Sequence, residues 1–202
     1  MITMAQSSTT ISGQKSFKSV ITATDIRFSY VSGTSSIITN STSLANLSAR
    51  DLITVTGTTN NNATLTVKSV ASDGKSITVE EVVATEASGA SVSLTYVGFV
   101  TDKHKGDGYY AQTDGVHTVA YHVSAGSATA SNNFNGKIKM QGSLATTPTE
   151  SDWFDINNTT FTADLSTKVS SYTFTGNFVW VRAKTYDQTN TTSSVSKILY
   201  NH

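Results

Sequence analysis

Short runs in which apolar side chains alternate with threonine or serine recur along most of the chain, for example at 52–56, 64–68 and 76–80. Successive side chains of a β-strand point to opposite faces, so a period of two indicates strands with one buried and one solvated face. Ser and Thr together make up 63 of the 202 residues. Threonine favours half-solvated strand surfaces, whereas helices favour Ala, Leu, Glu and Lys. The sequence therefore predicts an all-β fold.

The charges of the chain balance, with 14 Lys and Arg against 14 Asp and Glu. Nucleic-acid binding gains its affinity from excess positive charge that releases counterions, so we expect no nucleic-acid partner. A net charge near zero also weakens repulsion between copies, which favours a homo-oligomer. The chain has no cysteine, so no disulfide supports the fold.

The N-terminal residues 1–10 combine neither a basic region nor an apolar run, so they are not expected to form a signal peptide. No apolar stretch approaches the roughly 20 residues that a membrane-spanning helix needs. We therefore expect no membrane partner, and a protein that is made and kept inside a cell or a particle.

The first half of the chain divides into a polar segment and a regular β-domain. Residues 1–24 contain only short strand-like pieces, which favours either a disordered N-terminal arm or a strand lent to a neighbour. From 25 to 98, five or six short strands follow at spacings of about ten residues, and Asp73-Gly74 is a typical turn. This pattern predicts a small β-barrel or sandwich.

A second domain follows a predicted linker at 99–108, where glycines and charges interrupt the alternation. Residues 109–202 predict an antiparallel β-sandwich. The segment 178–184 is apolar on both faces over its first half, which is typical of a central strand. Asn135-Gly136 indicates a hairpin before the strand at 137–140.

Exposed aromatic residues are the best candidates for a binding site. Tyr109, Tyr110 and Trp153 lie in the C-terminal half, and aromatic rings can stack on sugars. The same residues also suit a buried core, which is the simpler interpretation. We keep them as possible contacts with a glycan or a protein partner.

Two groups of residues include histidines that could bind a metal, but their composition and spacing favour a structural role. Asp102, His104 and Asp107 lie close in sequence, but calcium loops are more densely acidic and zinc requires more His or Cys. His117 and His122 are five residues apart, so on a strand they face opposite sides and cannot bind one ion together. We expect no metal and no cofactor.

Catalytic motifs are also lacking in the sequence. Glu80, Glu81 and Glu86 lie at a strand end and a loop, whereas glycosidases need two carboxylates across a cleft. The chain has no Gly-x-Ser-x-Gly, phosphate-binding loop or His-Glu-x-x-His, and no identifiable base activates its many serines. The sequence therefore does not predict an enzyme.

The series DLITVTG at 51–57, NNNATLTV at 60–67, SITV at 76–79 and EASGASV at 86–92 resembles a small β-domain that recurs in virion proteins of tailed bacteriophages. The chain departs from that pattern at Arg50 and Ala63, where glycine is usual, and at Leu65, where tyrosine is usual. These changes affect turn geometry and one core position, and they leave the fold expectation unchanged.

Residues 141–154 together with 174–184 resemble a β-sandwich of structural proteins in cyanophages and other marine tailed phages. The resemblance implies a non-enzymatic virion structural protein, such as a capsid-decoration, neck, tail or fibre-base component. It also implies other virion proteins as partners and a location in the virion after assembly in the host cytoplasm. The alternative hypothesis is an adhesion module that binds a host receptor or a surface glycan.

Overall fold

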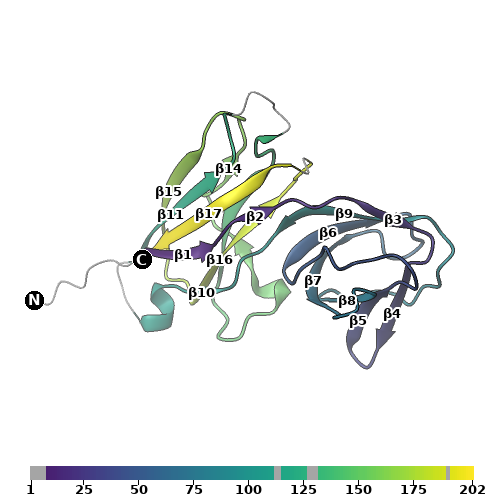
Figure 1. The fold of residues 1–202 in the computed structure, drawn as a ribbon. Coiled ribbons are helices and arrows are strands. Elements are labelled where there is room, and N and C mark those ends of the chain that lie inside the picture. The colour runs from purple at the N-terminus through teal and green to yellow at the C-terminus, as the bar shows by residue number, and fades with distance from the viewer. Residues whose placement is uncertain (1–7, 112–114, 127–131, 190–191) are drawn as a thin grey trace, which may run out of the picture. The chain divides into compact units, whose positions relative to one another are not determined.

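The computed structural model describes residues 8–111, 115–126, 132–189 and 192–202 (Figure 1). The described residues form antiparallel strands with short 3-10 helices at Asp107–Tyr110 (η1) and Glu150–Asp152 (η3), so the predicted all-β fold is confirmed. The chain divides into two compact units. We call Lys18–Phe99 the inserted unit, and we call the combination of Met1–Phe17 with Val100–His202 the split unit.

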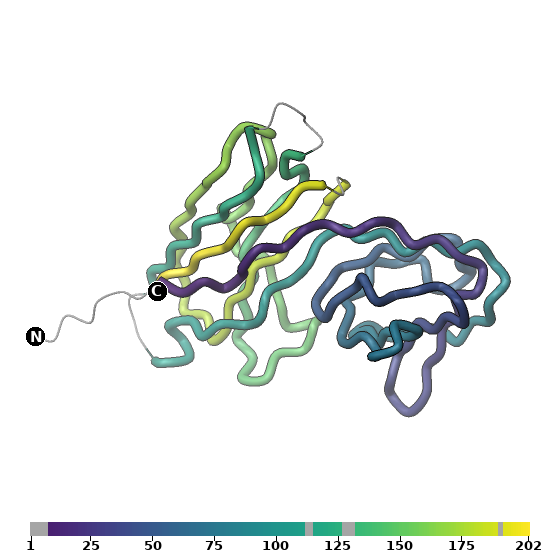
Figure 2. Tube along the Cα trace, in the orientation of Figure 1, coloured from purple at the N-terminus to yellow at the C-terminus, as the bar shows by residue number. Residues whose placement is uncertain are grey.

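The inserted unit is built on a single path of seven antiparallel strands. The neighbours along this path are β3 (Ile21–Ala23), β9 (Val92–Phe99), β6 (Asp51–Thr56), β7 (Thr64–Val70), β8 (Ser76–Val79), β5 (Thr34–Ile38) and β4 (Arg27–Val31). Figure 2 traces how the chain curls around one interior. The predicted succession of short strands is therefore present.

One apolar cluster forms the interior of the inserted unit. Its fully enclosed members come from alternating strand positions, and they include Ile37, Ile53, Val55, Ile77 and Leu94. Threonines at the intervening positions lie on the outer face, where Thr54 and Thr64 contact each other across β6 and β7 at 3.0 Å. The period of two in the sequence thus separates the two faces of these strands.

The split unit contains two sheets. The first has the order β1 (Ser8–Ser12), β17 (Ser194–Asn201), β11 (Val116–Val123) and β15 (Val169–Thr175), and β2 (Lys15–Ser16) also pairs with β17. The second has the order β10 (His104–Lys105), β16 (Trp180–Tyr186), β12 (Lys137–Ser143) and β13 (Phe154–Asp155), and β14 (Phe161–Thr162) also pairs with β12. This arrangement matches the predicted antiparallel β-sandwich.

Large side chains from both sheets fill the interior of the split unit. Tyr121 on β11 is 1% exposed, and its hydroxyl donates to the backbone carbonyl of Thr159, which follows β13. Phe174 on β15 packs against Phe178, which precedes β16, with ring centroids 6.1 Å apart. The buried hydroxyl of Tyr121 therefore has a hydrogen-bond acceptor in the interior between the two sheets.

The N-terminal segment differs from the arm or lent strand expected for residues 1–24. In its described part, β1 and β2 pair with β17 of the same chain, and β3 pairs with β9. Ile11 and Phe17 are buried, and they are the apolar side chains by which this otherwise polar segment packs onto the interior. Long-range pairing with apolar strands thus orders a segment whose own sequence packs poorly.

The linker expected at 99–108 also belongs to regular structure. Phe99 ends β9, while the Thr101 backbone N–H donates to the Ala183 carbonyl at 2.9 Å. His104 and Lys105 then pair with Val181 and Trp180 as strand β10. Edge pairing with β16 therefore incorporates these residues into the second sheet.

We predict that Ile11→Ala destabilises the split unit. Removing a buried isoleucine side chain typically costs at least about 2 kcal/mol, because a cavity remains. Thr10→Ala, an exposed neighbour on β1, is the control and should change the unfolding free energy by less than about 0.5 kcal/mol. Both tryptophans lie in the split unit, so tryptophan fluorescence in urea measures its unfolding. Equal midpoints for the two variants would contradict the placement of β1.

Candidate functional site

Tyr109 and Tyr110 lie on the short helix η1 and are both half-exposed, at 45% and 49%. Their ring centroids are 5.2 Å apart in an edge-to-face arrangement. The helix lies close to the chain before β16, since the backbone N–H of Gly108 donates to the Phe178 carbonyl at 2.9 Å. A Cβ atom at Gly108 would lie within 2.7 Å of the Asn177 carbonyl oxygen, so only glycine allows this approach.

Trp180 and two lysines join the tyrosine pair. The Tyr109 and Trp180 rings are 5.0 Å apart between centroids. The ammonium group of Lys103 lies 4.3 Å from the centroid of Trp180, and that of Lys105 lies 4.1 Å from the centroid of Tyr109. Lys105 is also paired with Trp180 in the register of β10 and β16. Attraction between each cation and the ring face holds the flexible lysine side chains in place.

These side chains border a cleft of about 280 Å³ within the split unit, which we call the aromatic–lysine cleft. The described residues that line it are Thr9, Lys103, His104, Lys105, Tyr110, Trp180, Tyr200 and His202. The described lining thus contains two lysines and no Asp or Glu side chain. Neither lysine has an ion-pair partner in the described part of the chain.

A buried polar layer lies behind the cleft. The hydroxyl of Tyr200 donates to Nδ1 of His117 at 2.7 Å, and Nε2 of His117 donates to the Gly176 carbonyl at 2.8 Å. The Gly176 carbonyl can only accept, so Nε2 of His117 carries a proton in this bond. Burial, and then the charge of Asp107, raises the pKa of Tyr200 well above its usual range. The tyrosine therefore remains a hydrogen-bond donor.

Two buried polar atoms near the cleft have no hydrogen-bond partner in the described structure. One is Oδ2 of Asp107, whose other carboxylate oxygen lies 3.2 Å from Nδ1 of His202. The other is Nε2 of His104, a residue of the cleft lining. Burial lowers the pKa of His104, and the charge of Asp102 only partly opposes this effect. The His104 ring is thus neutral near pH 7.

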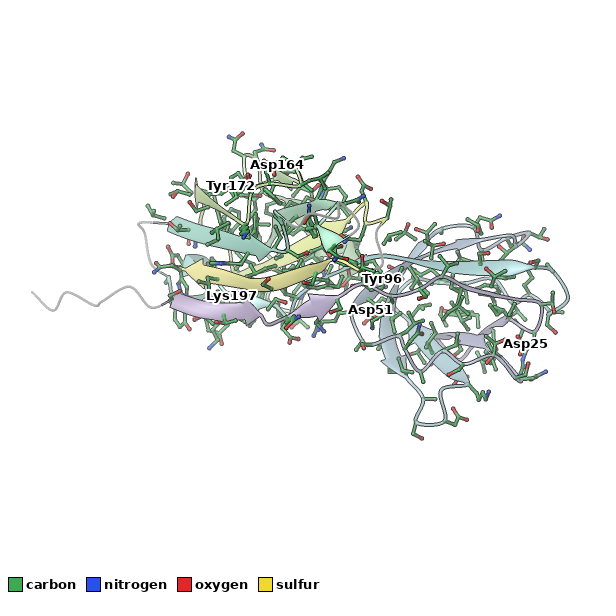
Figure 3. The ribbon with its side chains drawn as sticks, turned by 45° about the horizontal axis from the view of Figure 1, so that its top comes forward. Asp25, Asp51, Tyr96, Asp164, Tyr172 and Lys197 are labelled. Carbon is green, nitrogen blue, oxygen red and sulfur yellow. The ribbon has the colours of Figure 1, made fainter. Side chains whose placement is uncertain are left out.

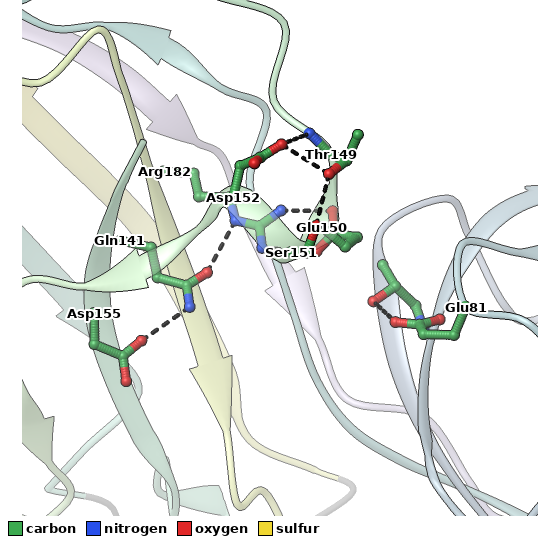
Figure 4. Close-up of polar contacts among 9 residues, drawn as sticks. Glu81, Gln141, Thr149, Glu150, Ser151, Asp152, Asp155 and Arg182 are labelled. Atoms are coloured by element: carbon green, nitrogen blue, oxygen red, sulfur yellow. Dashed lines mark hydrogen bonds and ion pairs between the residues drawn. The ribbon is translucent and has the colours of Figure 1, made fainter. Parts of the chain in front are cut away.

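Trp153 belongs to a different cluster, which surrounds Arg182. Figure 4 shows two polar members of that cluster, Glu150 and Gln141. The guanidinium carbon of Arg182 lies 4.3 Å from the centroid of the Trp153 ring. Its two terminal nitrogens donate to the two carboxylate oxygens of Glu150, both at 2.8 Å, and its Nε donates to Gln141 at 2.9 Å. Arg182 is 4% exposed, so this paired fork satisfies a buried charge.

The structure therefore separates the three predicted contact residues. Tyr110 lines the aromatic–lysine cleft, Tyr109 adjoins it through Lys105 and Trp180, and Trp153 covers Arg182 instead. Sequence reasoning missed Trp180, Lys103 and His202 as members of the cleft. Trp180 was assigned to a central strand, and only its pairing with Lys105 shows that its face adjoins the tyrosines.

The other titratable groups take structural positions. His117 is buried and His122 is half-exposed on the opposite face of β11, as predicted. Among the described residues, no three His, Asp or Glu side chains gather in a way that could hold a metal ion. Glu86 accepts the backbone N–H groups of Thr59 and Asn60 at 2.8 and 3.2 Å, which fixes a loop.

Several carboxylates anchor loops in this way (Figure 3). One oxygen of Asp25 accepts the backbone N–H groups of Ser41 and Thr42 at 2.7 and 3.0 Å, and these bonds hold the pKa of Asp25 well below its usual range. The hydroxyl and backbone N–H of Thr167 lower the pKa of Asp164 to about 2. Both carboxylates thus stabilise turns in their ionised form.

Comparison with known proteins identifies no relative: no protein-family model matches the chain, and no curated protein matches it. Within the described residues, no helix has the length and apolar character needed to cross a membrane.

We predict that Asp25 makes the stability of the inserted unit depend on acid pH. Its pKa is lower in the folded chain than in the unfolded chain, where aspartate titrates near ~3.9. Its contribution to the free energy of unfolding is therefore complete above about pH 5 and is lost as the pH falls through the folded pKa. Asp25→Asn should lower the melting temperature at pH 7 and reduce its decline between pH 5 and 2 in calorimetry.

The matched control is Asp73→Asn, which changes a turn carboxylate that accepts a single backbone N–H, from Lys75. This variant should follow the wild-type pH profile. A profile of Asp25→Asn that runs parallel to wild type over the whole range would refute the proposed role of Asp25.

Proposed function

We propose that the chain is a non-enzymatic virion structural protein of a tailed bacteriophage, which acts through contacts with its own copies and with other virion proteins. The observation that carries the contact function is the open edge of the first sheet of the split unit at β15. The sequence resemblances at 51–92, and at 141–154 together with 174–184, support the virion class.

Strand β15 has the features of an assembly edge. It ends the path of its sheet, and in the described chain no strand pairs with its outer side. Its sequence VSSYTFT is free of charge and proline, and Val169 is 51% exposed. Edge strands that avoid pairing normally carry lysine, proline or a bulge. Strand β15 lacks the lysine and proline over seven residues, so it is suited to pairing with another strand.

A second copy of the chain is the partner that fits this edge best. Two β15 strands that meet antiparallel about a two-fold axis would place only uncharged side chains opposite each other. The zero net charge of the chain removes the long-range repulsion that would oppose such a contact. The balance of charges and the composition of the edge therefore favour self-association.

The loop anchors support the same function. Carboxylates that accept backbone N–H groups, such as Asp25, Glu86 and Asp164, fix surface loops in single conformations. A pre-ordered surface loses less conformational entropy when it binds a partner. Within this proposal, the protein is a capsid-decoration, neck, tail or fibre-base component that enters the virion during assembly in the host cytoplasm.

We predict that Ser171→Lys weakens self-association. Ser171 is exposed near the centre of β15. A lysine there would face β15 of the second copy, and its charge would disfavour pairing, as lysines on natural edge strands do. The control is Ser196→Lys, which adds the same charge at an exposed position of β17, a strand paired on both sides. Sedimentation velocity across a concentration series should show dimers for wild type and the control, and monomers for Ser171→Lys. Equal association of all three would refute the β15 contact.

The virion assignment is tested on intact particles. Antibody or gold labelling in electron microscopy should locate the protein at a fixed position on the phage particles that contain it, with a regular copy number. Purified particles that lack the protein, while infected cells contain it, would refute the assignment.

A further inference from the structure

We propose that the aromatic–lysine cleft binds a carboxylate-bearing sugar residue, of the uronic or sialic acid class. This inference goes beyond the virion function and is independent of it, because it rests on the cleft geometry. It assigns a ligand-binding role to Lys103, Lys105 and Tyr110 in the split unit.

The charge of the cleft selects an anion. Lys103 and Lys105 lie at its border and have no carboxylate partner in the described structure, while the neighbouring carboxylate of Asp107 is buried and only 1% exposed. The ammonium of Lys103 contacts Trp180, while that of Lys105 contacts Tyr109 and lies 5.4 Å from the centroid of Tyr110. An ammonium has three N–H donors, so each lysine keeps at least one for a ligand. A carboxylate held between these two lysines would form charge-assisted hydrogen bonds.

The aromatic rings select a sugar ring. Tyr110 lines the cleft and keeps 49% of its surface exposed, and Tyr109 beside it keeps 45%. Tyr110 stacks on His202 with centroids 6.0 Å apart, and the Lys105 ammonium lies 5.4 Å from its centroid. The C–H groups of a pyranose would therefore contact the part of the ring that stays exposed. Ring contacts with Lys105 and Trp180 hold Tyr109 in place before binding, which reduces the entropy lost on association.

A buried polar group, Nε2 of His104, belongs to a residue of the cleft lining. Nε2 of His104 is buried without a partner, and such a group lowers stability until a donor or acceptor meets it. The neutral ring can accept from, or donate to, a sugar hydroxyl according to its tautomer. Nε2 has essentially no exposed surface, so a sugar hydroxyl would reach it only after the His104 side chain turns toward the cleft.

The composition and size of the cleft separate this ligand from other anions. No arginine lines this cleft, so its two lysines supply point charges and no bidentate fork. A nucleic acid would need excess positive charge, which the chain lacks. The volume of about 280 Å³ lies just below the range of pockets for drug-sized ligands, so it suits one sugar unit of a longer glycan.

The test is isothermal titration of the full chain with the methyl glycosides of glucuronic acid and of N-acetylneuraminic acid. Methyl glucoside is the neutral counterpart, and inorganic phosphate is the simple anion. We expect at least one acidic glycoside to bind about tenfold more tightly than methyl glucoside, because only it forms charged hydrogen bonds. Absence of binding by both acidic glycosides at millimolar concentration would overturn the proposal, as would equal binding of the neutral sugar.

Variants then test the named residues. The double variant Lys103→Gln with Lys105→Gln should reduce the affinity for the acidic glycoside at least about tenfold, and Lys103→Arg with Lys105→Arg should restore most of it. Tyr110→Ala should weaken sugar binding but leave any phosphate binding unchanged. The control is Lys197→Gln, an exposed lysine on β17 outside the cleft lining (Figure 3).

Two results from the variants would overturn the proposal. If Lys197→Gln reduced the affinity as much as the double glutamine variant, binding would depend on overall charge and not on this cleft. If phosphate bound as tightly as the sugar acid and Tyr110→Ala changed neither, the cleft would be a simple anion site. Urea unfolding monitored by tryptophan fluorescence verifies that each variant is folded, because both tryptophans lie in the split unit.

Discussion

The split unit depends on one constraint: its last strand, β17, must pair with a neighbour on each side. Strand β17 is bounded by β1 and β2 on one side and by β11 on the other. Its inward residues Ile198 and Tyr200 are almost fully buried, and Tyr200 also bonds to His117. The backbone N–H and C=O groups on both edges of such a buried strand need hydrogen-bond partners. The polar N-terminal segment supplies one of them, so the first described residues are as integral to the sheet as the last.

The proposed functions follow from what this framework leaves unused. Backbone pairing and anchored carboxylates satisfy most of the polar groups that the strands and loops present. The proposals use two features of the described split unit: the uncharged outer edge of β15, and the cleft with Lys103 and Lys105, which lack ion-pair partners there. The first offers backbone groups to another strand, and the second offers charge and ring faces to a small ligand. Assembly and glycan contact are thus compatible roles on separate elements of one rigid unit.

Local pattern explains which parts of the structure the sequence could predict. The regular alternation at Val116–Val123 and Asp51–Thr56 indicated strands, because side-chain period is a local property. Strands β1, β2 and β10 are short and polar, and their partners lie far along the chain. The sequence showed strand-like pieces within residues 1–24, but no local signal identified their partners in the same chain. The same holds for the site. Tyr109 and Tyr110 were recognised because they are adjacent in the sequence. Trp180 joins them only through the register of β10 with β16. Trp153 instead packs on the buried Arg182, a contact that no local pattern predicts.

Hydrogen exchange of the backbone amides in β1 and β17 tests the central claim most directly. If β1 closes the sheet of its own chain, amides of both strands in the hydrogen-bonded ladder should exchange slowly, and their protection should not change on dilution. A strand lent between copies would lose protection as the protein is diluted. Exchange of β1 at unprotected rates while β17 and β11 remain protected, or protection that falls with concentration, would contradict the account.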